Sequence, residues 1–489
     1  MSSDQAAARP GTRSRDRARA APAAVGFLVL VELTSGIMQG MMPALTPELG
    51  RALGISAGSL NWITGAQLLA AAVSLPLLAR LGDLYGHRRV LRVAGLFLAV
   101  GSLVVAWSPS FAVLLAGRIL QAPLSALLPL EIGLVRDRLS PQRARRGIGL
   151  LVGALTFGTS AGMVLSGTLG QVIPSVHGVL LVPALATVLC AGVLFWLVPE
   201  STTRARGTVD WAGAALLSLG LAALLLGVSR CSAHGWSPLA AGELVLSAAL
   251  LAAWPAVERA AAHPLVDIRI TIRRDLLPTY AASFLLGVTL FGAQTAAALF
   301  LAAAPGQDGY GFGASALTVG WVLFPAGLCA FGAATVAPGL RRAAGARTVP
   351  ALGGALLATG YATLVHAHHA IWLPVLLNAV LGFGTGLVFS SLPALILDVS
   401  PADRIGIATG VYSTAKTLGG SIGSAVFAAV LSSMTIKNST VPTESAYTTV
   451  WWLCATASLG VTAAACALRR PRAAAEPRLS WRSQDGGGR

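Results

Sequence analysis

Long apolar stretches alternate with short polar, arginine-rich segments along nearly the whole chain. Each stretch has roughly 20 residues, the length that an α-helix needs to cross a bilayer. Such continuous runs exclude the apolar–polar alternation of a membrane β-barrel, and only helices remain. The pattern predicts an all-α integral membrane protein with about fourteen spans, near 23–45, 57–81, 91–108, 111–135, 147–171, 179–199, 211–229, 238–258, 278–303, 315–338, 348–366, 372–396, 406–432 and 447–468.

Composition and charge support a membrane location. Only 11% of the 489 residues are charged, against about 25% in soluble proteins. The net charge of +16 would suggest a nucleic-acid partner in a soluble protein. Here the charges lie in loops and tails, and roughly 30 of the 35 lysines and arginines fall on one side of the predicted spans. We therefore expect a multi-pass protein of the plasma membrane with both termini in the cytoplasm, the lipid bilayer as partner, and no nucleic acid.

The loop between the second and third spans reads RLGDLYGHRR, from Arg80 to Arg89. It resembles the signature G-x-x-x-D-R-x-G-R-R of the major facilitator superfamily, with matches at Asp83, Gly86 and Arg88. Asp83 can cap a helix end or pair with a basic group on another helix. Gly86 allows a sharp turn, and Arg88 and Arg89 hold the loop on the cytoplasmic side.

The order of the spans resembles the fourteen-helix drug:proton antiporter branch of that superfamily. A weaker copy of the loop motif, PGLRRAAGAR, follows the tenth span. The resemblance implies a basic tail (1–22), an N-terminal six-helix half (23–199), an extra hairpin (211–258), a C-terminal six-helix half (278–468) and a second basic tail (469–489). Two short motifs support it, Arg118-Ile119-Leu120-Gln121 in the fourth span and Glu32-Leu33-Thr34 in the first.

The fifth span departs from the antiporter signature G-x-x-x-G-P-x-x-G-G. Gly158 and Gly162 match, whereas Thr159 replaces the proline. Small residues still recur every four positions, which predicts a groove for close helix packing. The missing proline leaves proton symport open as an alternative to antiport.

Two ionisable side chains fall deep in the first half. Glu32 is the only acidic residue that we place near the middle of the bilayer, where burial favours a neutral carboxyl. It is our candidate proton carrier, the alternative being a structural hydrogen-bonding role. Arg118 stays charged, and we expect it to pair with Glu32 and tune its protonation.

Three further charged residues are candidates for a gate. Asp83 could pair with Lys416 of the thirteenth span across the two halves, or Lys416 could extend to the membrane surface. Glu131 lies thirteen residues after Arg118, about 220° around a continuous helix. We therefore expect it to face away from Arg118 and to pair with a loop arginine.

The substrate pocket should be lined by amides and aromatic rings carried by the spans, although packing against lipid is the alternative for each ring. The candidates are Gln39, Asn61, Trp62, Gln67, Gln121, Phe157, Gln294 and Asn378.

Neither a metal site nor a cofactor is expected. His366, His368 and His369 fall in an outer loop and are interpreted as solvated histidines, with a weak metal site as the alternative. The chain has no G-x-x-x-x-G-K-[ST] phosphate loop, so the proton gradient rather than ATP should supply the energy. No catalytic constellation is present, so an enzyme is not expected.

The resemblance thus implies a monomeric proton-coupled transporter that exports lipophilic or amphiphilic small molecules. Uptake by proton symport and a non-transporting membrane sensor or scaffold are the alternatives.

Overall fold

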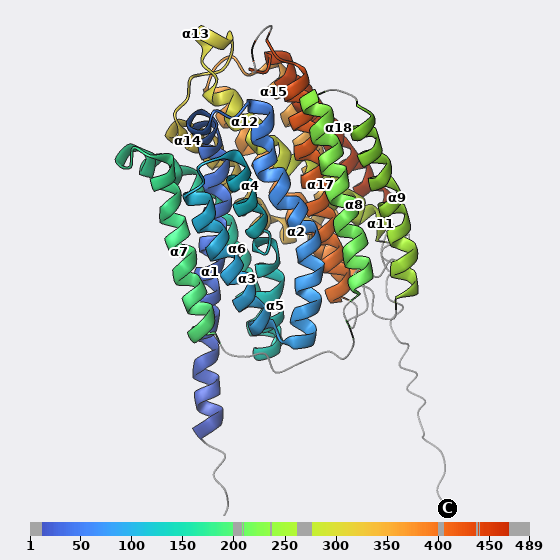
Figure 1. The fold of residues 1–489 in the computed structure, drawn as a ribbon. Helices are drawn as coiled ribbons and strands as arrows, with labels where there is room; N and C mark the ends of the chain where they lie inside the picture. Colours follow the sequence, from blue (N-terminus) through green and yellow to red (C-terminus); the bar gives the residue numbers. More distant parts are fainter. Residues whose placement is uncertain are drawn as a thin grey trace, which may run out of the picture.

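The chain forms a bundle of long helices that run side by side between two loop-bearing ends (Figure 1). The structure, a computed structural model, describes residues 12–198, 208, 210–234, 237–261, 276–399, 405–436, 439 and 441–468. Among these residues, thirteen helices are long and apolar enough to cross a membrane, and α8 contains a shorter apolar segment, Trp211–Leu224. The all-α prediction of about fourteen spans is confirmed.

Seven helices form the N-terminal half, because the fourth span is divided in two. They are α1 (Thr12–Leu53), α2 (Ala57–Tyr85), α3 (His87–Ala106), α4 (Phe111–Leu120), α5 (Leu124–Arg138), α6 (Pro141–Val172) and α7 (Val176–Trp196). Helix α1 begins inside the segment expected to be a tail, since its alanines and arginines are strong helix formers. Residues 1–11 of that tail and the whole of 469–489 lie outside the described residues.

Helices α8 (Trp211–His234) and α9 (Pro238–Ala260) pack against each other, and α8 also packs against α2 and α17. The second half has helices α11 (Leu277–Gly287), η1 (Val288–Gly292), α12 (Ala293–Ala302), α13 (Pro305–Asp308), α14 (Ala316–Ala344), α15 (Thr348–His366), α16 (Trp372–Val399), α17 (Ile405–Ser433) and α18 (Glu444–Ala467).

Several spans begin at the end of the bundle that carries α13, and serine residues cap the N-termini of these helices. Ser56, Ser110 and Ser315 accept hydrogen bonds from backbone N–H groups of the first turns of α2, α4 and α14. Each bond satisfies one of the donors that a helix N-terminus leaves free. We call this the outer end, and the opposite end, where α1 begins, the inner end (Figure 1).

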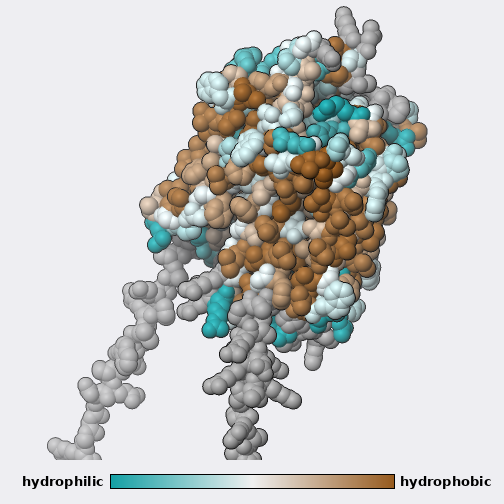
Figure 2. Space-filling model, turned by 90° about the vertical axis from the view of Figure 1, so that its left-hand side faces the viewer, coloured by the Kyte–Doolittle hydropathy of each residue, from teal (hydrophilic) through white to brown (hydrophobic). Residues whose placement is uncertain are grey.

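The surface of the bundle carries a broad apolar region between more polar ends (Figure 2). Many large apolar side chains of the described residues are exposed, among them Leu189, Trp196 and Leu239. An exposed apolar area of this extent suits hydrocarbon rather than water. The protein is a multi-pass membrane protein.

The two halves meet along two helix pairs, α2 with α17 and α6 with α14. At the outer end, α12 also packs against α1 and α2. An apolar cluster joins the halves there, made of Ala44, Met163, Ala298, Leu301, Ala314, Val319, Val322 and Leu323. The inner part of the same span, α11, packs instead against α16, α17 and α18 of its own half.

Candidate functional site

Two buried carboxyl groups lie together inside the N-terminal half. Glu32 on α1 is 1% exposed and Glu131 on α5 is 0% exposed. They are near enough for the charge of Glu32 to act on Glu131. Within the described residues, Glu32 Oε2 and both carboxyl oxygens of Glu131 have no hydrogen-bond partner. The cluster therefore holds two acidic groups shielded from water.

The structure corrects one part of the prediction for Glu131, its pairing with a loop arginine, because the carboxyl group is buried and has no hydrogen-bond partner among the described residues. That prediction assumed a continuous fourth span. The helix instead breaks at Gln121–Pro123, and α5 starts a new helix at Leu124. Proline cannot continue the helical hydrogen-bond ladder, so Pro123 was the signal for this break. In the structure Glu131 lies near Glu32 of α1.

Arg118 does not pair with Glu32, contrary to expectation. The guanidinium donates from Nε to the carbonyl of Ile63 at 3.2 Å and from Nη1 to Oε1 of Gln121 at 2.7 Å. Gln121 in turn donates to the hydroxyl of Ser102 at 3.0 Å. Arg118 thus links α4 to α2, and the Gln121 amide extends the link to α3. It also lines a small cavity beside Met38 and Met41.

The thiol of Cys190 is a further member of the acidic cluster. It lies near Glu131 and donates to the hydroxyl of Thr34 at 3.3 Å. Thr34 in turn donates to the carbonyl of Leu30. Cys190 had no recognised role in the sequence, because its neighbours come from α1 and α5, far away in the chain.

The loop at Asp83 turns at Gly86, whose φ of 104° suits glycine and few other residues. Asp83 lies 3.5 Å from Nε2 of His87, one helical turn later. Arg88 and Arg92 donate to the carbonyl of Phe195 at the end of α7. The loop arginines thus satisfy the free carbonyl end of a neighbouring span, where positive charge is favourable.

Lys416 does not reach Asp83 in this structure. Its ammonium lies 4.4 Å from the ring centre of Phe389 and 5.7 Å from that of Tyr412. Cation–π contacts of this kind stabilise a charge that is partly removed from water. A pairing of Asp83 with Lys416 in another conformation stays a prediction.

The predicted pocket residues are spread over several helices. Asn61 is fully buried, and neither of its amide atoms has a hydrogen-bond partner among the described residues. Gln67 is buried as well, whereas Gln39 is half-buried and donates to Ser35. Phe157 is 61% exposed. Trp62, Gln294 and Asn378 are partly exposed, and the amide of Asn378 donates to the carbonyl of Pro374. The structure does not bring the predicted pocket residues together around one cavity.

The small residues of the fifth span make the closest helix contact of the first half. Helices α1 and α6 lie so near that a Cβ atom at Gly162 would be 2.9 Å from the Cα atom of Ile37. A Cβ at Gly158 would be 3.1 Å from the backbone nitrogen of the same residue. The glycines therefore let the two backbones touch, as the small-residue pattern predicts.

One irregular segment had no counterpart in the sequence analysis. The ninth span contains a π-helical turn at Val288–Gly292, a feature often found at functional positions. Gly287 precedes this turn and Gly292 ends it, and both leave room for α17, since a Cβ at Gly292 would meet the ring of Phe427. These two glycines, five residues apart, were the feature of the sequence that could have indicated the π-helical turn.

The expectation of three solvated histidines is wrong for His368. Its ring is buried, and only His366 and His369 are exposed.

Comparison with known proteins identifies the family. A model described as Major Facilitator Superfamily matches residues 28–424. The chain is 28% identical to a tetracenomycin C resistance and export protein of Streptomyces glaucescens, over 86% of this chain and 77% of that protein. It is also 30% identical to a cephamycin export protein of Amycolatopsis lactamdurans, over 83% of each chain.

Solved structures agree on the fold. The nucleoside transporter NupG matches with a TM-score of 0.66 at 14% identity, over 91% of this chain and 100% of that chain. The human organic anion transporter MFSD10 matches with a TM-score of 0.60 at 19% identity, over 92% of this chain and 99% of that chain. The helix bundle and the sequence match lead to one conclusion: the chain belongs to the major facilitator superfamily, a family of transporters and not of enzymes.

Proposed function

We propose that this transporter exports lipophilic or amphiphilic small molecules in exchange for protons, with Glu32 and Glu131 as the proton site. The relatives named for export or resistance support the direction of transport. The observation that carries the proton coupling is the buried pair of carboxyl groups.

A water-free pair of carboxyl groups suits proton exchange for an electrostatic reason. Two negative charges repel each other at low dielectric constant, which disfavours ionisation of both groups at the same time. No arginine or lysine is paired with either carboxyl among the described residues. A proton shared by the pair would remove this repulsion, and a change that admits water to the cluster would favour its release.

The contacts at the outer end fit one state of an alternating cycle. Thr64 of α2 and Thr295 of α12 lie 3.4 Å apart across the two halves, beside the apolar cluster around Ala44. These contacts close the outer side. Release of substrate to the outside requires them to separate, and rocking of the halves about a central site would do this.

The inner gate is the second part of the proposal. With the outer side closed, Asp83 contacts His87, and Lys416 lies over Phe389. In the opposite state Asp83 and Lys416 would approach each other and lock the inner end. The substrate would bind between the halves, next to the buried amide of Asn61.

The proposal also covers the energy source, the oligomeric state, the location and the partners of the protein. The proton gradient supplies the energy, so no cofactor is required. The protein works as a monomer in the plasma membrane, with both termini in the cytoplasm and with lipid, substrate and protons as its only partners.

Accumulation of a panel of lipophilic compounds in cells tests the proposal. Cells that express the protein should retain less of at least one compound, and a proton uncoupler should abolish the difference. Glu131→Gln should also abolish it. Glu243→Gln should not, because Glu243 forms a salt bridge with Arg230 at 2.7 Å in the hairpin, outside the buried pair. Export that survives the uncoupler, or survives Glu131→Gln at equal protein level, would contradict the proposal.

A further inference from the structure

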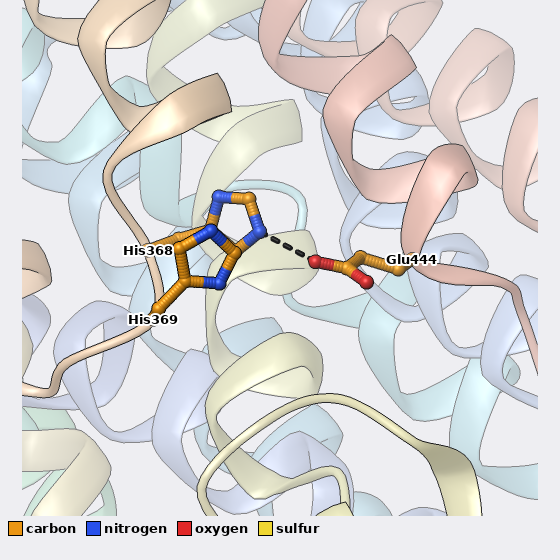
Figure 3. Close-up of side chains that lie close together, drawn as sticks. All are labelled: His368, His369 and Glu444. Atoms are coloured by element: carbon orange, nitrogen blue, oxygen red, sulfur yellow. Dashed lines mark hydrogen bonds and ion pairs between the residues drawn. The ribbon is translucent and has the colours of Figure 1, made fainter.

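A compact group of metal-binding side chains lies at the outer end of the second half, apart from the acidic cluster. His368 and His369 come from the loop between α15 and α16, and Glu444 is the first residue of α18. One potential ligand atom from each residue lies within 4.8 Å of the other two. Figure 3 shows the two imidazole rings next to each other, facing the carboxylate.

We propose that His368, His369 and Glu444 bind one divalent transition-metal ion, with Zn²⁺ as the best fit. Two imidazole nitrogens and one carboxylate oxygen are a donor set that Zn²⁺ prefers, and Ni²⁺ and Cu²⁺ also accept imidazole. Neither Ca²⁺ nor Mg²⁺ suits this set, since both prefer oxygen ligands.

Hydrogen bonding orients the His368 ring so that one of its nitrogens can bind a metal ion. Its Nδ1 lies 2.9 Å from the carbonyl of Leu364, an acceptor, so this nitrogen carries a proton. The lone pair of the neutral ring is then on Nε2, which faces Glu444. A backbone carbonyl on the second ring nitrogen is the usual way in which proteins orient a metal-binding histidine.

Packing fixes the same ring from its other sides. His368 is only 5% exposed. Its ring centre lies 5.5 Å from that of Phe300 and 5.3 Å from that of Trp451. A side chain locked in this way loses little freedom when it binds an ion.

Glu444 supplies the negative charge. It is the first residue of α18, where the free N–H groups of the helix N-terminus carry partial positive charge. Its side chain is 43% exposed, and His369 is exposed too. Water can therefore reach the ion and complete a tetrahedral shell.

Nε2 of His368 and Oε1 of Glu444 are 2.6 Å apart. Bond lengths of about 2.0–2.1 Å to Zn²⁺ require roughly 3.3 Å between two tetrahedral ligands. The half-exposed Glu444 side chain has to move by less than about 1 Å to make that space, a change within rotamer adjustment. In the absence of metal, the imidazole of His368 and the carboxylate of Glu444 contact each other directly.

An ion at this position would connect the loop between α15 and α16 to the start of α18. It would stabilise the outer rim of the second half without taking part in the proton step. Zinc should therefore raise the thermal stability of the purified protein.

Metal titration of the tag-free, chelator-treated protein in detergent tests the proposal. We expect one equivalent of Zn²⁺ in calorimetry, an upward shift of the unfolding temperature, and visible absorption bands of tetrahedral Co²⁺ when Co²⁺ replaces zinc. His369→Asn changes an exposed side chain and should weaken Zn²⁺ binding at least tenfold, and Glu444→Gln should do the same.

His366→Asn is the matched control, because His366 is exposed in the same region but lies beside Trp452 and outside the group. It should bind zinc like the wild type. No stoichiometric binding by the wild-type protein would overturn the proposal and leave only the direct contact between His368 and Glu444. Equal zinc affinity of His369→Asn and the wild type would overturn it as well.

Discussion

The contact between α1 and α6 makes a quantitative prediction about glycine. Gly162→Ala places a methyl group 2.9 Å from both the Cα atom and the carbonyl carbon of Ile37. These are backbone atoms, so they cannot move aside by a rotamer change, and the two helices must separate. Gly149→Ala on the same helix is the control, because a Cβ there has no atom within 4 Å.

Both variants gain the same helix propensity, about 0.8–1 kcal/mol for glycine to alanine. Only Gly162→Ala also carries the overpacking penalty, about 1–3 kcal/mol. The shared gain cancels between the two, so Gly162→Ala should be about 1–3 kcal/mol less stable than Gly149→Ala. In a protein of this size, each kcal/mol of lost stability lowers the unfolding midpoint by at most a few degrees. The midpoint of Gly162→Ala should be lower than that of Gly149→Ala by a corresponding amount.

Thermal unfolding of the purified variants in detergent, followed by the loss of the monodisperse peak in size-exclusion chromatography, measures this difference. Gly149→Ala should unfold at or slightly above the temperature of the wild type. Equal midpoints for Gly162→Ala and Gly149→Ala would refute the argument that backbone contact makes glycine necessary at position 162.

Three further predictions concern the gate, the arginine and the topology. Asp83→Asn should slow transport far more than it lowers the amount of folded protein, because Asp83 is half exposed and is proposed to pair in the other state; normal transport at equal expression would exclude the gate. Arg118→Lys cannot keep both charged hydrogen bonds to Ile63 and Gln121, so it should lower stability by about 1.5–3 kcal/mol, and an unchanged unfolding midpoint would contradict this. Alkaline phosphatase fused after Gly309 should be active and after Gly345 inactive, if α13 faces the cell exterior; the reverse would invert the topology.

The sequence predicted the spans well and the partners within the site poorly. Spans follow from the length of apolar segments, a local property, and the predicted limits at 348–366 and 372–396 coincide with the observed spans. The turn at Gly86 was also predictable, since it depends on one residue and its neighbours.

Side-chain partners depend instead on how helices rotate against each other. The sequence placed Glu32 and Arg118 correctly inside the bundle but paired them on depth alone. The α-helix is interrupted at Gln121–Pro123, and Glu131 of α5 rather than Arg118 of α4 lies near Glu32. For the same reason His368, interpreted as solvated, lies among aromatic rings from α12 and α18 that are distant in sequence.

Transport into inside-out membrane vesicles tests the central claim most directly, because the interior of such vesicles corresponds to the cell exterior. A compound identified by the accumulation assay is added while a pH gradient of either sign is imposed. Wild-type vesicles should accumulate it when their interior is acidic, and Glu32→Gln and Glu131→Gln vesicles should not. Accumulation only with the opposite gradient would mean uptake by symport, and unchanged coupling in both variants would place the proton site elsewhere.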